Sequence, residues 1–121
     1  MEVLLDGSFM LHGLRNGIDF FSQLEEKGFT VTIPREVLQE LKDVKLKSKS
    51  DNRRAIDSLF ELIEKRKVKK VGIGSGKVDL QLIKLGKNGK YIATMDSAIR
   101  RSVPNRVVIS SATKKISVER S

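Results

Sequence analysis

The sequence contains no cysteine and only one histidine, His12. Disulfides, thiolate zinc sites and a cysteine nucleophile are therefore excluded. A Ser–His–Asp triad would have to use His12, and no nucleophile-elbow sequence is present. No apolar run approaches the roughly 20 residues of a membrane-spanning helix, and the first residues lack the basic region and the length of a signal peptide. We therefore expect a soluble cytoplasmic protein with no membrane partner.

Aromatic residues make up only 5% of the chain, whereas charged residues make up 32% and give a formal net charge of +9. The charge is uneven, with net −4 over residues 1–41, +7 over residues 42–77 and +5 over residues 98–121. A basic surface attracts polyanions such as nucleic acid, although lysines also serve solvation alone in heat-adapted proteins. With so few aromatics, we expect base stacking to contribute little to nucleic-acid binding.

Short apolar segments with strand-like patterns alternate with helical patterns along the 121 residues, which is the length of one domain. The expected strands are residues 3–5, 29–33, 68–73, 91–94 and 107–109, and the expected helices lie between them. This alternation predicts an α/β fold with a parallel sheet covered by helices on both faces. Sites in such sheets form outside the carboxyl ends of the strands.

Local signals predict where several of these elements begin and end. Asn16 is a candidate cap for the second helix, Pro34 suits the first position of the third, and Asp51 or Asn52 can cap the fourth. Residues 44–50, with three lysines and two serines, have the composition of a mobile loop. Residues 111–121 are expected to form either an edge strand or a loose tail.

Four carboxylates lie where these elements meet. Asp6 and Asp96 directly follow strand segments, Glu40 lies on the helix after the second strand, and Asp79 opens the helix after a glycine-rich turn. Each acid alone also has an ordinary structural explanation, as a helix cap, a charge near a helix N-terminus or a solvated surface residue. For Glu36, one turn before Glu40, we favour the surface explanation. Gathered together in a basic protein, such carboxylates would repel one another unless a cation were present. Mg²⁺ and Mn²⁺ prefer oxygen ligands, so the set indicates a divalent-metal site for phosphodiester hydrolysis.

A second phosphate-binding possibility, in residues 72–77, fails on spacing. The sequence Gly-Ile-Gly-Ser-Gly-Lys resembles a P-loop, but that motif would need glycine at Val71 and serine or threonine at Val78. A dinucleotide-binding loop would need glycine at Lys77. We therefore interpret this segment as a turn.

The four acids lie in segments that resemble, in order and spacing, those of the PIN domain, a family of small metal-dependent ribonucleases. The resemblance covers most of residues 3–110 and is carried by VLLDGSF (3–9), IPREVLQEL (33–41), VDLQLI (78–83) and IATMDSAIRR (92–101). It implies a single PIN-like domain over residues 1–121, built as a three-layer α/β/α sandwich with a five-stranded parallel sheet in the order 3-2-1-4-5.

The resemblance also implies which residues form the site. It assigns metal binding and catalysis to Asp6, Glu40, Asp79 and Asp96, with supporting polar roles for Ser8 and Thr94. The sequence departs from the family pattern in three places. Leu80 stands where a second acid is common, Gly86 where a small alanine is common, and Gly7 follows the first acid. None of these departures removes one of the four acids.

The implied activity is endonucleolytic cleavage of single-stranded RNA with Mg²⁺ or Mn²⁺. Family members include archaeal and eukaryotic factors that process ribosomal RNA and VapC toxins paired with an antitoxin, and many form homodimers. A ribosome-assembly factor or an antitoxin is therefore an expected partner, and a non-catalytic RNA-binding module in ribosome biogenesis is the alternative function. Candidate contacts to the RNA backbone are Lys45, Lys47, Lys49, Arg53, Arg54, Arg100 and Arg101.

Overall fold

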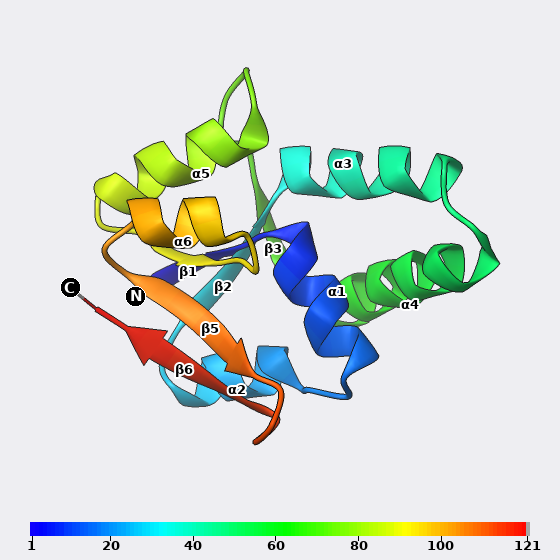
Figure 1. Ribbon diagram of the computed structural model, residues 1–121, viewed down its shortest axis with the longest axis horizontal. Coiled ribbons are helices and arrows are strands. Elements are labelled where there is room, and N and C mark those ends of the chain that lie inside the picture. The colour runs from blue at the N-terminus through cyan, green and yellow to red at the C-terminus, as the bar shows by residue number, and fades with distance from the viewer. Residues whose placement is uncertain (121) are drawn as a thin grey trace.

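A computed structural model describes residues 1–120, in which strands and helices alternate around one sheet (Figure 1). The strands are β1 (Glu2–Leu5), β2 (Thr30–Pro34), β3 (Lys69–Val71), β4 (Tyr91–Ala93), β5 (Arg106–Ser110) and β6 (Lys115–Glu119). The helices are α1 (Gly7–Arg15), α2 (Phe20–Glu26), α3 (Arg35–Leu46), α4 (Ser50–Arg66), α5 (Val78–Lys87) and α6 (Ser97–Ser102). The sequence therefore predicted each of the first five strands close to its observed position.

The sheet has the strand order β3-β2-β1-β4-β5-β6. Pairing among the first five strands is parallel, which confirms the predicted α/β fold and the order 3-2-1-4-5. The sixth strand corrects the prediction of five parallel strands, because β6 pairs antiparallel with β5 and forms the edge. Of the two alternatives for residues 111–121, the edge strand is therefore correct. Ile116 of β6 is buried and anchors this strand to the core.

Apolar side chains cover both faces of the sheet and produce three layers. On one face, α1, α2 and α4 contribute buried residues to a core that includes Phe9, Phe21 and Leu59. On the other face, Leu82 of α5 and Ile99 of α6 pack on β1 and β4. Figure 1 shows α5 and α6 together on one side, while α3 and α4 form a helical hairpin on the other. This confirms the predicted α/β/α sandwich.

Two predicted helix starts are wrong by a few residues. Asn16 ends α1, with its backbone N–H bonded to the carbonyl of His12, and Asp19 instead caps α2 by accepting a hydrogen bond from the Ser22 backbone N–H at 3.2 Å. Pro34 is the last residue of β2 and precedes α3, because its ψ of 133° is extended and not helical. The first error arises because Asn16 and Asp19 both have side chains that suit a cap, whereas Pro34 lies only one residue outside α3 and forms no side-chain cap.

The predicted loop over residues 44–50 is shorter than expected, because residues 44–46 and 50 are helical and only residues 47–49 connect the two helices. The third helix continues to Leu46 and the fourth begins at Ser50, after Lys49 as its cap, so neither Asp51 nor Asn52 caps it. Lysine and leucine are good helix formers, and the Ser48 hydroxyl donates to the Val44 carbonyl at 2.6 Å. The lysines that indicated a mobile loop therefore lie at the tip of the α3–α4 hairpin.

In the part of the chain that the structure describes, none of the helices combines the length and the apolar composition that a membrane span requires.

Candidate active site

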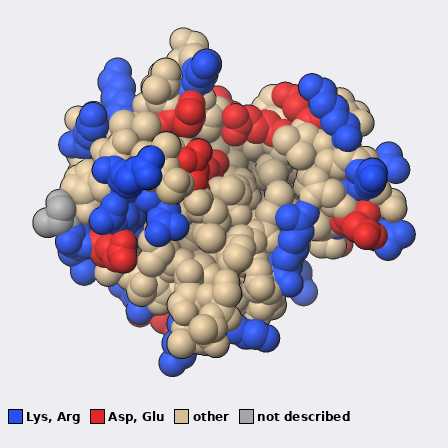
Figure 2. Space-filling view, in the orientation of Figure 1, with Lys and Arg blue, Asp and Glu red and all other residues tan. Residues whose placement is uncertain are grey.

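The four predicted acids come together in one pocket of about 330 Å³. Asp6 and Asp96 lie beyond the carboxyl ends of β1 and β4, which are neighbours in the sheet, while Glu40 comes from α3 and Asp79 from the first turn of α5. Figure 2 shows Asp and Glu side chains gathered around the hollow between the α3–α4 side and the α5–α6 side of the molecule. The hollow therefore lies at the carboxyl edge of the sheet, where parallel α/β folds form their sites.

Asp6 is the most enclosed of the four acids. Its Oδ1 accepts a hydrogen bond from the Gly7 backbone N–H at 2.9 Å, and its Oδ2 accepts one from the Thr94 hydroxyl at 2.7 Å and a longer one from Ser8 at 3.3 Å. Burial raises the pKa of Asp6, and the charge of Asp96 adds to this rise, while the hydrogen bonds from Thr94, Gly7 and Ser8 oppose it. The net rise means that ionising Asp6 is costly in the absence of a cation.

Thr94 connects the two acids that follow β1 and β4. Its side chain is completely buried, and its hydroxyl, while donating to Asp6, accepts a hydrogen bond from the Asp96 backbone N–H at 3.1 Å. The Ser8 hydroxyl lies 3.4 Å from that of Thr94 and accepts from the Met95 backbone N–H at 3.1 Å. Ser8 and Thr94 thus both hydrogen-bond to the Asp6 carboxylate and to the backbone of residues 95–96, which connects the two acids.

Asp96 combines a capping role with an open oxygen. It caps α6, where its Oδ1 accepts from the backbone N–H groups of Ala98 and Ile99 at 2.8 and 3.4 Å. Within residues 1–120, its Oδ2 has no hydrogen-bond partner. The side chain therefore stabilises the helix with one oxygen while the other is free to meet a ligand in the pocket.

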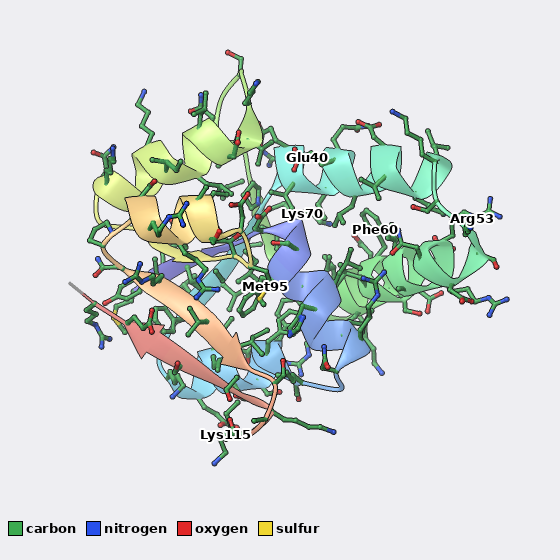
Figure 3. All side chains as sticks on the ribbon, viewed as in Figure 1. Glu40, Arg53, Phe60, Lys70, Met95 and Lys115 are labelled. Carbon is green, nitrogen blue, oxygen red and sulfur yellow. The ribbon has the colours of Figure 1, made fainter. Side chains whose placement is uncertain are left out.

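Glu40 and Asp79 are exposed and face the same pocket from opposite helices. Desolvation raises the pKa of Glu40, and the nearby charges of Asp6, Asp79 and Asp43 raise it further. All of these influences act in one direction and make the charged form of Glu40 less favourable. Figure 3 shows Glu40 on the half of α3 that lies nearer to α5.

The donor set fits a hard divalent cation. All four side chains offer carboxylate oxygens, which Mg²⁺ and Mn²⁺ prefer, and none of the four forms an ion pair within residues 1–120. However, no three His, Asp or Glu side chains of the described chain are grouped closely enough to coordinate one metal ion in the observed conformation. The pocket thus has the right chemistry for such an ion, with Asp6, Glu40, Asp79 and Asp96 as the residues that would hold it.

The seven predicted phosphate contacts flank this pocket but do not line it. Lys45, Lys47, Lys49, Arg53 and Arg54 lie at the tip of the α3–α4 hairpin, where Figure 3 shows Arg53 far from Glu40. Arg100 and Arg101 lie on α6, on the opposite side of the pocket. Two of the hairpin residues are engaged in ion pairs, Lys45 with Asp57 and Arg54 with Asp51.

Sequence reasoning missed two residues near the site. Lys77, which belongs to a segment that the sequence predicts only as a turn, lines the pocket immediately before α5. Glu36, expected to be a solvated surface residue, accepts the Ile73 backbone N–H with both carboxylate oxygens at 3.1 and 3.3 Å. The only sequence signals were that Lys77 lies two residues before Asp79 and that Glu36 lies one turn before Glu40.

Comparison with solved structures identifies the fold. The chain superimposes on a structure described as the PIN domain endonuclease Utp24 with a TM-score of 0.76 and 18% sequence identity, over 99% of this chain and 92% of that one. No family model matches the sequence, and no curated protein matches it either. This likeness shows that the chain has the PIN-domain fold, which agrees with the resemblance seen in its four acidic segments.

Proposed function

We propose that this chain, which has the PIN-domain fold, is an Mg²⁺- or Mn²⁺-dependent endoribonuclease that hydrolyses phosphodiester bonds of single-stranded RNA. The observation that carries the proposal is the convergence of Asp6, Glu40, Asp79 and Asp96, far apart in sequence, on one pocket. Support also comes from the fold shared with a PIN domain endonuclease and from the net charge of +9. The short, lysine-rich chain favours precursor ribosomal RNA as the substrate.

In this proposal, the acidic, hydroxyl and basic residues of the chain have different roles. Asp6, Glu40, Asp79 and Asp96 would hold the ion, whose chemistry when bound is to activate water and to neutralise negative charge at a scissile phosphate. Thr94 and Ser8 fix the orientation of the Asp6 carboxylate through their hydroxyls. The basic residues on either side of the pocket would hold the RNA backbone without reading its sequence.

The Asp96→Asn variant tests this proposal. Asparagine is also a good helix cap, so the hydrogen bonds to Ala98 and Ile99 can persist while the negative charge is lost. We expect cleavage of a fluorescent oligoribonucleotide in Mn²⁺ to fall about 100-fold or more, with the melting temperature in EDTA nearly unchanged. Glu61→Gln is the matched control, because Glu61 is an exposed acid on α4 that does not line the pocket. If Asp96→Asn cut RNA as fast as the wild type, the site assignment would be wrong.

A non-catalytic RNA-binding module is the second candidate, because no three acidic side chains of residues 1–120 form a finished metal site. Calorimetric titration with Mn²⁺ separates the two candidates. The nuclease requires saturable Mn²⁺ binding that is lost in Asp96→Asn. Salt-sensitive RNA binding by the wild type without any saturable Mn²⁺ binding would instead identify the module.

A further inference from the structure

Lys77 is the one cation among the residues that line the acid pocket in the described chain. It shares the pocket with the four carboxylates and with the apolar side chains of Val78, Leu82 and Ile99. A lysine in this position opposes the binding of any other cation there. The presence of Lys77 in an acidic pocket therefore needs a physical reason. An anion that binds in the pocket together with a metal ion would supply that reason.

The segment that carries Lys77 is fastened at several points. The Glu36 carboxylate holds the Ile73 backbone N–H, and the Gln81 side-chain amide donates to the Ser75 carbonyl at 2.8 Å. Glu36 lies on α3, as does Glu40, and Gln81 lies on α5, as does Asp79. The helices that carry two of the acids thus also hold the segment 72–77, and this fixes the backbone of Lys77 relative to the pocket.

The turn itself depends on two glycines. Gly74 and Gly76 have φ values of 102° and 101°, which only glycine adopts at little cost. They reverse the chain so that Lys77 becomes the residue before the first turn of α5, where its carbonyl accepts the Gln81 backbone N–H at 3.1 Å. The glycine-rich sequence therefore serves to place Lys77 and α5, and its resemblance to a P-loop is coincidental.

Within residues 1–120, the ammonium group of Lys77 forms no ion pair. Six other Lys and Arg residues of the described chain form ion pairs with Asp or Glu. Lys77 forms none within residues 1–120, although four carboxylates line the same pocket, and its side chain is exposed. The segment 72–77 thus places a lysine at the pocket, with an ammonium group that forms no ion pair to the acids within residues 1–120.

We propose that Lys77 is a substrate-binding residue whose ammonium contacts a non-bridging oxygen of the RNA phosphate that enters the acid pocket. This inference rests on the proposed function, since it takes RNA as the ligand. The acids attract the divalent ion, and Lys77 together with that ion attracts the phosphate. Lys77 therefore favours occupation of the pocket by metal and phosphate together and disfavours occupation by metal alone.

Opposite effects on two ligands test the proposal. In Lys77→Met, removal of a positive charge beside the acids should tighten Mn²⁺ binding, measured by calorimetry without RNA, by about two- to three-fold. The same variant should raise the KM for a single-stranded oligoribonucleotide about ten-fold, the value of one charge-assisted hydrogen bond. Lys77→Arg should preserve both values to within about two-fold, because it retains the charge and the donor groups.

Lys84→Met is the matched control. Lys84 lies on α5, which Lys77 immediately precedes. It is exposed and does not line the pocket, and its removal changes the net charge equally. We expect neither Mn²⁺ binding nor KM to change by more than about two-fold. If Lys77→Met weakened both ligands, its role would be structural, and if it changed KM no more than Lys84→Met, the phosphate contact would be refuted.

The proposed function and the role of Lys77 can fail separately. If the wild type bound the oligoribonucleotide in Mn²⁺ without cutting it, the nuclease function would be overturned. Fluorescence anisotropy of the same oligoribonucleotide with the three variants would then still compare binding. A loss of affinity in Lys77→Met alone would support the phosphate contact, and equal affinities would overturn it.

Discussion

Two residues of the candidate site serve the local structure and the pocket at the same time. Asp6 and Asp96 both cap helices through Oδ1, which is the role that the sequence could not distinguish from a functional one. Their second oxygens differ. The Oδ2 of Asp6 is held by Thr94, whereas that of Asp96 has no partner in residues 1–120. A capping aspartate can thus also be a ligand, because the cap uses only one of its two oxygens.

Thr94→Val tests how strongly this network holds the acids. Valine has nearly the same shape but leaves the Asp96 backbone N–H without its acceptor and removes the shortest hydrogen bond to Asp6. We expect the free energy of unfolding to fall by about 1–3 kcal/mol in urea denaturation. Thr30→Val, at an exposed position of β2, should change it by less than about 0.5 kcal/mol. Equal effects of the two substitutions would show that the Thr94 hydroxyl is not important for stability.

At the scale of the elements, close packing between α5 and α6 fixes the distance between the parts that carry Asp79 and Asp96. Gly86 of α5 has no room for a side chain, because an added Cβ would lie 2.3 Å from Cγ1 of Val103 and 3.1 Å from that of Ile92. This explains why the chain has glycine where related patterns often have alanine. The side chains of Val103, which ends α6, and of Ile92 in β4 lie directly against the α5 backbone, so only the smallest residue fits at this point.

Gly86→Ala tests this packing. Alanine favours the helix by about 1 kcal/mol, but the clash with Val103 should cost more, so we expect a net loss of about 1–2 kcal/mol in the free energy of unfolding. Val103→Ala removes the nearest carbon atom. Urea denaturation of the double variant should therefore show less destabilisation than the sum of the two single variants. Additive effects would mean that α5 and α6 can move apart to accept the methyl group.

At the scale of the whole molecule, acidic and basic side chains occupy different parts of the surface. The acids occupy the hollow at the carboxyl edge of the sheet, and Figure 2 shows Lys and Arg side chains on both sides of it. Basic residues at the tip of the α3–α4 hairpin and on α6 thus lie on opposite sides of the pocket. A flexible polyanion that contacts both groups would have to cross the acids, and it would be held there only with help from a bound cation.

Salt dependence of RNA binding tests this arrangement. If RNA contacts both sides, replacing Arg53 or Arg101 with glutamine should each lower the slope of log Kd against log salt concentration by about 0.7, the value for one lost phosphate contact on a single strand. Lys65→Gln is the control, since Lys65 lies at the other end of α4. An effect of Arg53 without any effect of Arg101, measured by fluorescence anisotropy, would mean that RNA follows only the hairpin.

The sequence by itself determined the α/β class and the first five strands, and it singled out the four acids that the fold brings to one pocket. It could do so because period-two and period-3.6 apolar patterns, and the residues that follow strands, are local properties. It did not determine the edge strand β6, the helical continuation through Val44, or the roles of Glu36 and Lys77. The continuation of α3 is local, and the lysines and serines of that segment obscured it. The edge strand and the roles of Glu36 and Lys77 instead depend on partners distant in the chain, such as β5 for β6 and Ile73 for Glu36. Tertiary structure decided them because the hydrogen bonds and burial that fix these residues form only when the layers are assembled.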